Sequence, residues 1–272
     1  MSLAESNKSL TLTQKSLDTG SKIYYNIDIE DLSMEKKSNT LSVSRIQCFN
    51  QCKYKFRLSY IDKVEQERFE FFKKGSKIHA EFEKLTRENI ESPHSQVVKN
   101  FLVSTTGKKH IETILDSQRE VRVGLKIEDN KVVPCDYNDK DCFFHGIIDV
   151  LNLKEKTILD YKTGSRKTYK DQDWTQLEYY SAWLFLNSDF DEIKISYLYV
   201  EHNHENSKVI KREELNKILK RILTNAIEIK AFRENPSEEH NVSWMCEYCS
   251  CRKHCKFFQE NKGLENIEFE TF

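Results

Sequence analysis

The sequence lacks any long apolar run. No stretch approaches the roughly 20 consecutive apolar residues of a membrane-spanning helix, and the N-terminus has no apolar segment typical of a secretory signal. These absences exclude a membrane protein and predict a soluble, cytoplasmic one with no membrane partner. The chain also has no internal repeat, and its 272 residues suit one large domain with a sizeable core.

The sequence also lacks an excess of charge of one sign. It contains 43 Lys and Arg against 44 Asp and Glu, so a surface for nucleic acid must be a local basic patch. Three segments combine basic residues with nearby aromatic ones, namely Arg45–Arg57, Lys73–Lys77 and Arg166–Lys170. They can hold a phosphate backbone while rings stack on bases, but solvated helix faces have the same composition.

The first part of the chain predicts an extension followed by helices. Residues 1–40 are rich in Ser, Thr, Asn and Lys, which predicts a loosely ordered N-terminal extension. Apolar residues at helical spacing then predict one helix over 41–60, a second over 69–89 that is interrupted at Gly75, and a third over 97–115. Together these helices predict a helical cap over residues 41–115.

After residue 115 the period of the apolar residues changes to two. Val121, Val123, Leu125 and Ile127 alternate with polar residues, as in a strand with one buried face. Further segments complete a predicted α/β core over residues 116–235: strands at 143–153, 157–161, 193–200 and 208–211, and helices at 173–186 and 213–234. Residues 236–272 follow as a cysteine-rich tail.

Two acidic residues lie on neighbouring predicted strands. Asp149 ends the segment G-I-I-D, and Asp160 begins D-Y-K-T-G after a short hairpin, so pairing of the strands brings the two carboxylates together. Two carboxylates among apolar residues are costly to bury unless a divalent cation neutralises them, and Mg²⁺ or Mn²⁺ fits oxygen ligands. The alternation of a strand places Lys162 on the same face as Asp160, with Tyr161 pointing away.

This trio of Asp149, Asp160 and Lys162 suits phosphodiester hydrolysis. The metal polarises the phosphate and activates a water molecule, while the lysine orients that water or stabilises the developing charge. A bare D-x-K pattern is more often a surface salt bridge, here between Asp160 and Lys162, beside an unrelated Asp149.

Several motifs in the same order resemble one known family. G-I-I-D followed by L-D-Y-K-T-G resembles the core of the PD-(D/E)XK nucleases, with Ile148 in place of the family's proline. The closest resemblance is to the RecB-like branch, which includes the AddB nuclease domain and the CRISPR-associated RecB-like exonucleases. Gly75–His79 is similar to the branch's G-x-x-x-H, and Gln176–Tyr180 to its Q-x-x-x-Y. The resemblance, over residues 42–255, implies a restriction-endonuclease-like core with a central mixed sheet flanked by helices.

The resemblance also implies roles for individual residues. It makes Asp149, Asp160 and Lys162 catalytic, and its implied metal ligands are His79, Asp149, Asp160 and the backbone carbonyl of Tyr161. Gln176 and Tyr180 would face the DNA backbone, and their spacing of four places both on one helical face. Without the family argument, a helix histidine packed beside Phe82 is favoured over a metal ligand for His79. Glu120 is a further candidate for the site, although a solvated glutamate at a strand end is the commoner outcome.

The cysteine tail contains a candidate metal site. Cys246, Cys249 and Cys255 have C-x₂-C-x₅-C spacing, which provides three thiolates and leaves a fourth ligand to be found. Cys251 or His254 can complete a local zinc site. The resemblance instead implies that Cys52 completes a [4Fe–4S] cluster, although the family's usual Cys-Pro is Cys-Lys here. Such a link across the core would stabilise the fold by about 4 kcal/mol, by analogy with a disulfide that closes a long loop.

These observations predict a metal-dependent DNA exonuclease that acts on single-stranded DNA or DNA ends, with endonuclease activity left open. Its setting would be recombination, repair, replication or CRISPR-type DNA processing. The motif G-x-x-x-x-G-K-[ST] is absent, so a helicase would be a separate partner, as would recombination or CRISPR-adaptation proteins. Two alternatives stay open: a noncatalytic DNA-binding adaptor with a structural metal cluster, and an RNA-processing enzyme.

Overall fold

The computed structural model describes residues 12–14, 25–27, 40–67, 69–92 and 94–261. Most of the expected loose extension over residues 1–40 lies outside these ranges. Within it, β1 (Leu12–Gln14) and β2 (Tyr25–Ile27) pair as a small antiparallel sheet. In the described part of the chain, no helix is both long enough and apolar enough to cross a membrane.

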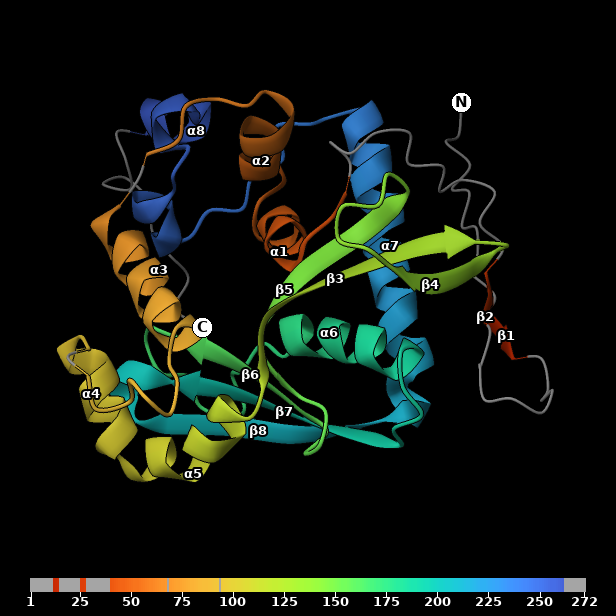
Figure 1. Ribbon diagram of the computed structural model, residues 1–272. Helices are drawn as coiled ribbons and strands as arrows, with labels where there is room; N and C mark the ends of the chain where they lie inside the picture. Colours follow the sequence, from red (N-terminus) through yellow and green to blue (C-terminus); the bar gives the residue numbers. More distant parts are fainter. Residues whose placement is uncertain (1–11, 15–24, 28–39, 68, 93, 262–272) are drawn as a thin grey trace, which may run out of the picture.

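A six-stranded mixed sheet forms the centre of the molecule (Figure 1). Its spatial order is β4-β3-β5-β6-β7-β8, in which only the β6–β7 pair is parallel. The strands are β3 (Gln118–Glu128), β4 (Lys131–Cys135), β5 (Cys142–Asn152), β6 (Thr157–Lys162), β7 (Glu192–Tyr199) and β8 (His204–Lys211). The expected hairpin between the two acidic strands is present as the β5–β6 pair.

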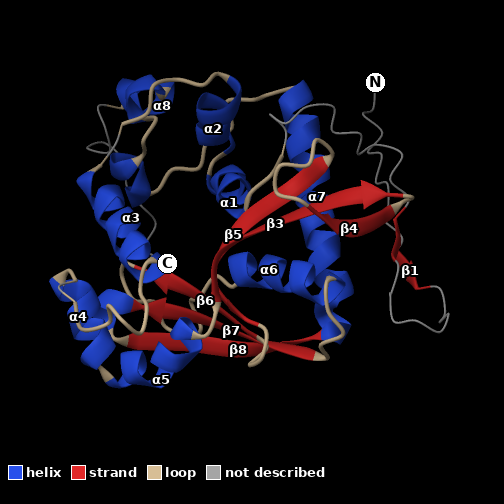
Figure 2. Cartoon of the chain, viewed as in Figure 1, coloured by secondary structure: helices blue, strands red, loops and turns tan. Residues whose placement is uncertain are grey.

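Helices cover both faces of this sheet (Figure 2). On one face, α1 (Val43–Gln51), α6 (Thr175–Leu186) and α7 (Leu215–Glu234) share the larger apolar core with the sheet. On the other face, α3 (Glu70–Glu83), α4 (Gln96–Val103) and α5 (Thr105–Leu115) share the second core. The predicted α/β architecture, a central mixed sheet flanked by helices, is confirmed.

Successive residues of β6 face opposite cores, and this alternation places the candidate site. Ile158 packs in the core that contains α6, whereas Leu159 and Tyr161 pack in the core that contains α3. The ring of Tyr161 stacks on Phe82 of α3 with centroids 4.2 Å apart. Asp160 therefore turns toward α6, as the alternation predicts, while Tyr161 points away from it.

The single helix expected over residues 41–60 is wrong, because it is divided at Cys52. The backbone of Cys52 is extended, with φ −162° and ψ 109°, so α1 ends before it and α2 (Lys53–Phe56) begins after it. The Cys52 sulfur accepts a hydrogen bond from the Lys55 backbone N–H, which caps α2. A π-helical turn, Arg57–Ile61, follows.

Two other helix predictions also need correction. Gly75 does not interrupt α3, which runs through it; a Cβ there would lie 2.9 Å from the Thr163 hydroxyl, so a glycine allows α3 to approach the end of β6. The helix expected over 97–115 is two helices, because Ser104 leaves the helical conformation and caps α5 through its hydrogen bond with the Gly107 N–H.

The sequence reading also missed β4. This strand contains Pro134, and a proline has no N–H for the ladder of a central strand. β4 lies at the edge of the sheet, where only one side must pair, which is why the proline is tolerated. The tail contributes two short 3₁₀ turns, Trp244–Tyr248 and Arg252–His254, and α8 (Lys256–Glu260).

Candidate active site

The two acidic residues lie where β5 and β6 part. The ladder between these strands pairs Asn152 with Thr157 and ends at Val150 and Leu159, one step before Asp149 and Asp160. Beyond that step, the Tyr161 backbone N–H donates to Asp149 Oδ2 over 2.8 Å. The Asp149 carboxylate thus accepts a hydrogen bond from an N–H that the ladder leaves unpaired. This bond fixes Asp149 at the fork, the point where β5 and β6 separate.

Glu120 joins the site through an irregularity in β3. Arg119 pairs with Val150 and Val121 with Ile148, so Glu120 lies opposite Asp149 without a regular pair between them. The φ angle of Glu120 is +52°, in the left-handed region that side chains rarely adopt. Strained backbone of this kind is concentrated at functional sites. The glutamate is half-buried rather than a solvated strand end.

His79 reaches the same point from α3. Its Nδ1 lies 3.4 Å from Asp149 Oδ2, and its ring meets Tyr161 edge-on with centroids 5.9 Å apart. Burial works to lower the pKa of His79, but the hydrogen bond and negative charge of Asp149 outweigh it, so the net pKa is raised. The histidine therefore contacts the acidic fork as well as the apolar core.

Together these three side chains form a group that can hold a cation. One ligand atom each from His79, Glu120 and Asp149 lies within 4.8 Å of the others, and no other such group occurs among the described residues. Burial first, and then the charge of Asp149, raises the pKa of Glu120. Oxygen and imidazole ligands suit a divalent ion such as Mg²⁺ or Mn²⁺, whose charge would relieve this repulsion. The residues therefore fit the metal that the sequence predicts.

Asp160 lies beside this group but is held differently. It is 2% exposed, and its two oxygens contact Lys162 Nζ at 2.7 Å and Gln176 Nε2 at 2.6 Å. Burial raises the pKa of Asp160 to about 6, against the opposing effect of Lys162. Asp160 and Lys162 are thus no surface salt bridge, and an ion shared by Asp160 and Asp149 stays a prediction.

Gln176 connects the acid and the lysine. Its amide nitrogen donates to Asp160 and its amide oxygen accepts from Lys162 Nζ over 2.9 Å, so one carboxamide fixes both catalytic candidates. The Lys162 ammonium also lies 4.7 Å from the centroid of the Tyr197 ring. Sequence reasoning assigned Gln176 to the DNA backbone and missed this bridge; its signal was the position of Gln176 in the first turn of the helix that follows Lys162.

The expected contact of Tyr180 with DNA needs correction. Tyr180 is 5% exposed, and a Cβ on Gly146 would lie 2.3 Å from its ring, so the ring fills the space that this glycine leaves. Burial raises the pKa of Tyr180 well above its usual range. Four-residue spacing put both side chains on one helical face, but that face packs on the sheet and covers Tyr180.

The cysteines of the two chain regions meet around one cavity. Cys52, Cys246, Cys249 and Cys255 all line a cavity of about 140 Å³. The four thiols therefore border one space, and whether it holds a [4Fe–4S] cluster or a zinc ion stays a prediction.

Cys251, the candidate for a local zinc site, lies beside the four predicted cluster ligands. It is fully buried and lines the same cavity, with its sulfur 3.2 Å from the Ser59 hydroxyl. The cavity therefore offers five thiols for four places, and the choice of Cys52 and the three tail cysteines as ligands stays a prediction.

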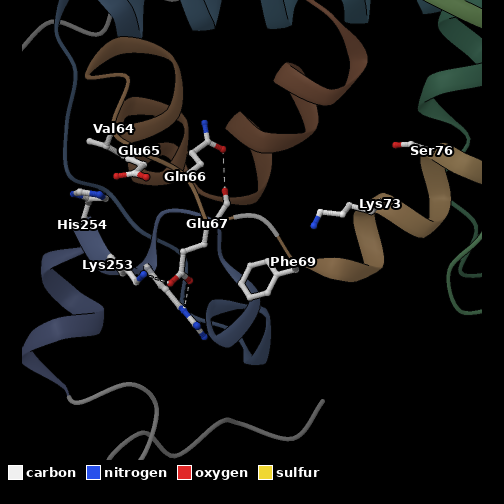
Figure 3. Close-up of a pocket in the computed structure, with 11 residues that line it drawn as sticks. Val64, Glu65, Gln66, Glu67, Phe69, Lys73, Ser76, Lys253 and His254 are labelled. Atoms are coloured by element: carbon white, nitrogen blue, oxygen red, sulfur yellow. Dashed lines mark hydrogen bonds and ion pairs between the residues drawn. The ribbon is translucent and has the colours of Figure 1, made fainter.

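A wide cleft of about 1200 Å³ separates the cysteine tail from the start of α3 (Figure 3). Lys73 and Ser76 of α3 line one wall, and Lys253 and His254 of the tail line the other. Glu67 reaches across to the tail, where it pairs with Arg252 at 2.5 Å and with Lys253 at 2.8 Å. Because Ser76 lies three residues before His79, the cleft wall of α3 leads toward the metal-binding group.

Comparison with known proteins identifies the family of this chain. One solved structure, titled "Crystal structure of SSO0001", has a TM-score of 0.39 and 15% sequence identity over 83% of this chain and 90% of that one. No curated protein sequence matches the chain. A family model of the PD-(D/E)XK nuclease superfamily matches residues 40–256, which include every candidate ligand described above. The chain therefore belongs to the PD-(D/E)XK nuclease superfamily and is a nuclease that cleaves nucleic acid with divalent metal ions.

Proposed function

We propose that this protein is a DNA exonuclease of the RecB-like branch, dependent on Mg²⁺ or Mn²⁺ and acting on single-stranded DNA or DNA ends. The observation that carries the proposal is the buried Asp160, held between Lys162 and Gln176 beside the group of His79, Glu120 and Asp149. A buried carboxylate, an ammonium and a cation-binding group within one site are the parts that phosphodiester hydrolysis needs.

A bound divalent ion would supply charge at the scissile phosphate and lower the pKa of a water molecule. His79, Glu120 and Asp149 would hold it, with the Tyr161 carbonyl and Asp160 as further ligands. Lys162 remains one-third exposed while Asp160 and Gln176 hold its ammonium, so it can donate to a phosphate oxygen or to the attacking water. A fixed donor of this kind stabilises the charge that develops in the transition state.

The cleft of Figure 3 supports a single strand as substrate. Its basic residues on both walls suit a phosphate backbone, and its α3 wall ends near His79. Glu67 forms ion pairs with Arg252 and Lys253, two cationic side chains that could otherwise bind a phosphate. We infer that the strand enters between the tail and α3, and that it displaces Glu67 as it binds.

We also propose that Cys52, Cys246, Cys249 and Cys255 bind a [4Fe–4S] cluster, with zinc as the alternative. The support is the shared cavity, which all four cysteines line. The role would be structural, because the ligands join the start of the cap to a tail that is far from it in the sequence. No motor motif occurs in the sequence, so a helicase or a recombination or CRISPR-adaptation protein would act as a separate partner.

The test is digestion of end-labelled oligonucleotides by anaerobically purified protein, with Mg²⁺ or Mn²⁺ and with EDTA. Single-stranded DNA, duplex DNA, circular single-stranded DNA and RNA form the substrate series. We expect metal-dependent release of nucleotides from linear single-stranded DNA, and a loss of about 10²–10³-fold in rate for Lys162→Ala. Lys217→Ala, on the exposed face of α7, is the control and should retain full activity.

Other outcomes identify the competing functions. Equal cleavage of circular DNA would show an endonuclease, and preference for RNA would show an RNA-processing enzyme. DNA binding with no cleavage under any metal, and no difference between wild type and Lys162→Ala, would contradict the proposal and favour a noncatalytic adaptor.

A further inference from the structure

A second cavity adjoins the catalytic candidates on the side away from His79. It has a volume of about 460 Å³, within the range of small-molecule and nucleotide pockets. Lys162 and Gln176 form part of its wall, so the cavity and the candidate active site share these two residues. The opposite wall is α1, which contributes Gln47, Asn50 and Gln51.

Five of the fourteen residues that line this cavity have neutral carboxamide side chains. Gln47, Asn50, Gln51 and Gln172 supply both donors and acceptors, and the Ser165 hydroxyl adds another polar group. Carboxamide side chains pair with the edges of nucleobases, and single-stranded nucleic acids are recognised through bases that are turned out of the stack. The lining therefore matches the hydrogen-bonding edge of a base.

Two of these amides have hydrogen-bonding capacity to offer. Asn50 donates to the Asn225 side chain over 3.3 Å, which leaves its carbonyl oxygen without a partner among the described residues. Within the same ranges, the Gln51 carboxamide has no hydrogen-bond partner at all, and both residues are exposed. Gln47 and Gln172, by contrast, are held by Asp173 and Tyr199. Asn50 and Gln51 are therefore the groups that a ligand would engage.

The charges in the cavity disfavour a second phosphate as its occupant. Asp173 lies in the wall, where Gln47 and the Thr175 N–H donate to its carboxylate at 2.9 Å each. Of the two lysines in the lining, Lys162 would serve the scissile phosphate in the candidate active site, which leaves Lys167. An anion would meet the Asp173 carboxylate beside Lys167, whereas a neutral base meets amides.

We propose that this cavity binds the nucleobase of the nucleotide next to the scissile phosphate, through Asn50 and Gln51. The proposal rests on the proposed function, because it places that phosphate at the metal-binding group and Lys162. A strand held there can turn the neighbouring base into the cavity, since Lys162 and Gln176 border both spaces. A carboxamide has both a donor and an acceptor and can therefore pair with any base. The site would thus detect that a base is present and would not distinguish one base from another.

The experiment measures binding without hydrolysis. Fluorescence anisotropy is recorded for short labelled single-stranded oligonucleotides without added divalent metal, with an abasic residue placed at each position in turn. Gln51 also lines the cysteine cavity, so the full chain is used with its native metal content. We expect the abasic residue to weaken wild-type binding about tenfold at one or two positions near an end.

The variant Asn50→Ala/Gln51→Ala completes the cycle. It should bind the intact strand as weakly as wild type binds the abasic one, with no further loss when both changes are combined. The matched control is Gln96→Ala/Asn100→Ala, which removes an exposed, mutually bonded amide pair from α4. This control should behave as wild type.

Two results would overturn the inference in distinguishable ways. If an abasic residue costs wild type and the Asn50→Ala/Gln51→Ala variant the same factor at every position, the cavity does not bind a base, while the nuclease assay still stands. If no oligonucleotide binds wild type in this assay, the inference fails, and the nuclease assay with Mg²⁺ or Mn²⁺ decides the proposed function separately.

Discussion

Asp149 and Tyr161 are joined by a hydrogen bond that takes the place of the sheet ladder, from the Tyr161 backbone N–H to Asp149 Oδ2 at 2.8 Å. The ladder between β5 and β6 ends one step earlier. The fork between the strands thus places a carboxylate in a fixed position, and the side chains of His79 and Glu120 converge on it. The point where the β5–β6 pairing ends therefore also determines where the candidate metal ligands meet.

Glu120 should show a conflict between stability and metal binding. A residue with a side chain loses about 1–2 kcal/mol relative to glycine when its φ is left-handed. Glycine gives back part of this difference, because its unfolded chain has more conformational entropy to lose. Glu120→Gly should therefore unfold with a free energy equal to or up to about 1 kcal/mol above that of wild type, while its Mn²⁺ affinity falls. Glu120→Ala, which keeps the strain and loses the carboxylate, should be the less stable variant. Chemical denaturation of both decides this, and Ala as stable as Gly would contradict it.

Glu67 should limit the entry of the strand. Removing its charge by Glu67→Gln frees Arg252 and Lys253, so affinity for single-stranded DNA should rise about threefold at low salt. The matched control is Glu65→Gln, which removes the same charge from the same cleft without releasing those two residues. Anisotropy titrations measure both variants. An equal gain in both would mean that general charge, and not the Glu67 ion pairs, controls binding.

Cys52 should decide both the metal content and the stability of the protein. Cys52→Ser should lose most of the iron and unfold with a free energy lower by about 4 kcal/mol, because the ligand joins distant parts of the chain. Cys135→Ser, a thiol outside the cavity, is the control. Iron and zinc analysis with thermal unfolding measures the effect. If wild-type protein contains stoichiometric zinc and no iron, the cysteines bind zinc and the cluster proposal is wrong.

Glu205 should make stability depend on acid. It pairs with the buried His110 at 3.0 Å, and its neighbours include Lys109. Burial works to raise the pKa of Glu205, but hydrogen bonds from His110 and Lys109 outweigh it and hold that pKa well below the ordinary 4.5. A lowered pKa means that this stabilisation is complete above pH 4.5 and is lost as the pH falls toward the folded-state value.

The variant Glu205→Gln tests that dependence. It should lower the free energy of unfolding by about 2 kcal/mol at pH 7, with a difference from wild type that shrinks below pH 4.5. Glu201→Gln removes a more exposed ion pair with Lys74 and should change stability little at either pH. Urea unfolding at a series of pH values measures both. A Glu205→Gln deficit that stays constant down to pH 3 would contradict the linkage.

Local rules were enough to predict the parts of the site that lie on regular strands. Alternation along β6 placed Asp160 and Lys162 together and Tyr161 on the other face, and the short turn predicted the β5–β6 hairpin. The same rules failed where tertiary contacts override them. Only the packed structure shows that α1 ends at Cys52, and that Tyr180 fills the space left by Gly146.

The sequence could not indicate the backbone of Glu120 or the bridge made by Gln176. A left-handed glutamate has no signal in composition, because the residue usually avoids that conformation. The contacts of Gln176 with Asp160 and Lys162 depend on how α6 packs against the sheet. Both features come from the assembly of elements that are far apart in sequence, which a local pattern does not encode.

Binding of Mn²⁺ measured by titration calorimetry tests the central claim most directly. Wild type and Asp149→Asn are compared, because the substitution keeps the shape of the side chain and removes the charge shared by His79 and Glu120. We predict one Mn²⁺ site in wild type and an affinity lower by at least about tenfold in Asp149→Asn. Equal affinity in the two proteins would contradict the metal site on which the proposed hydrolysis depends.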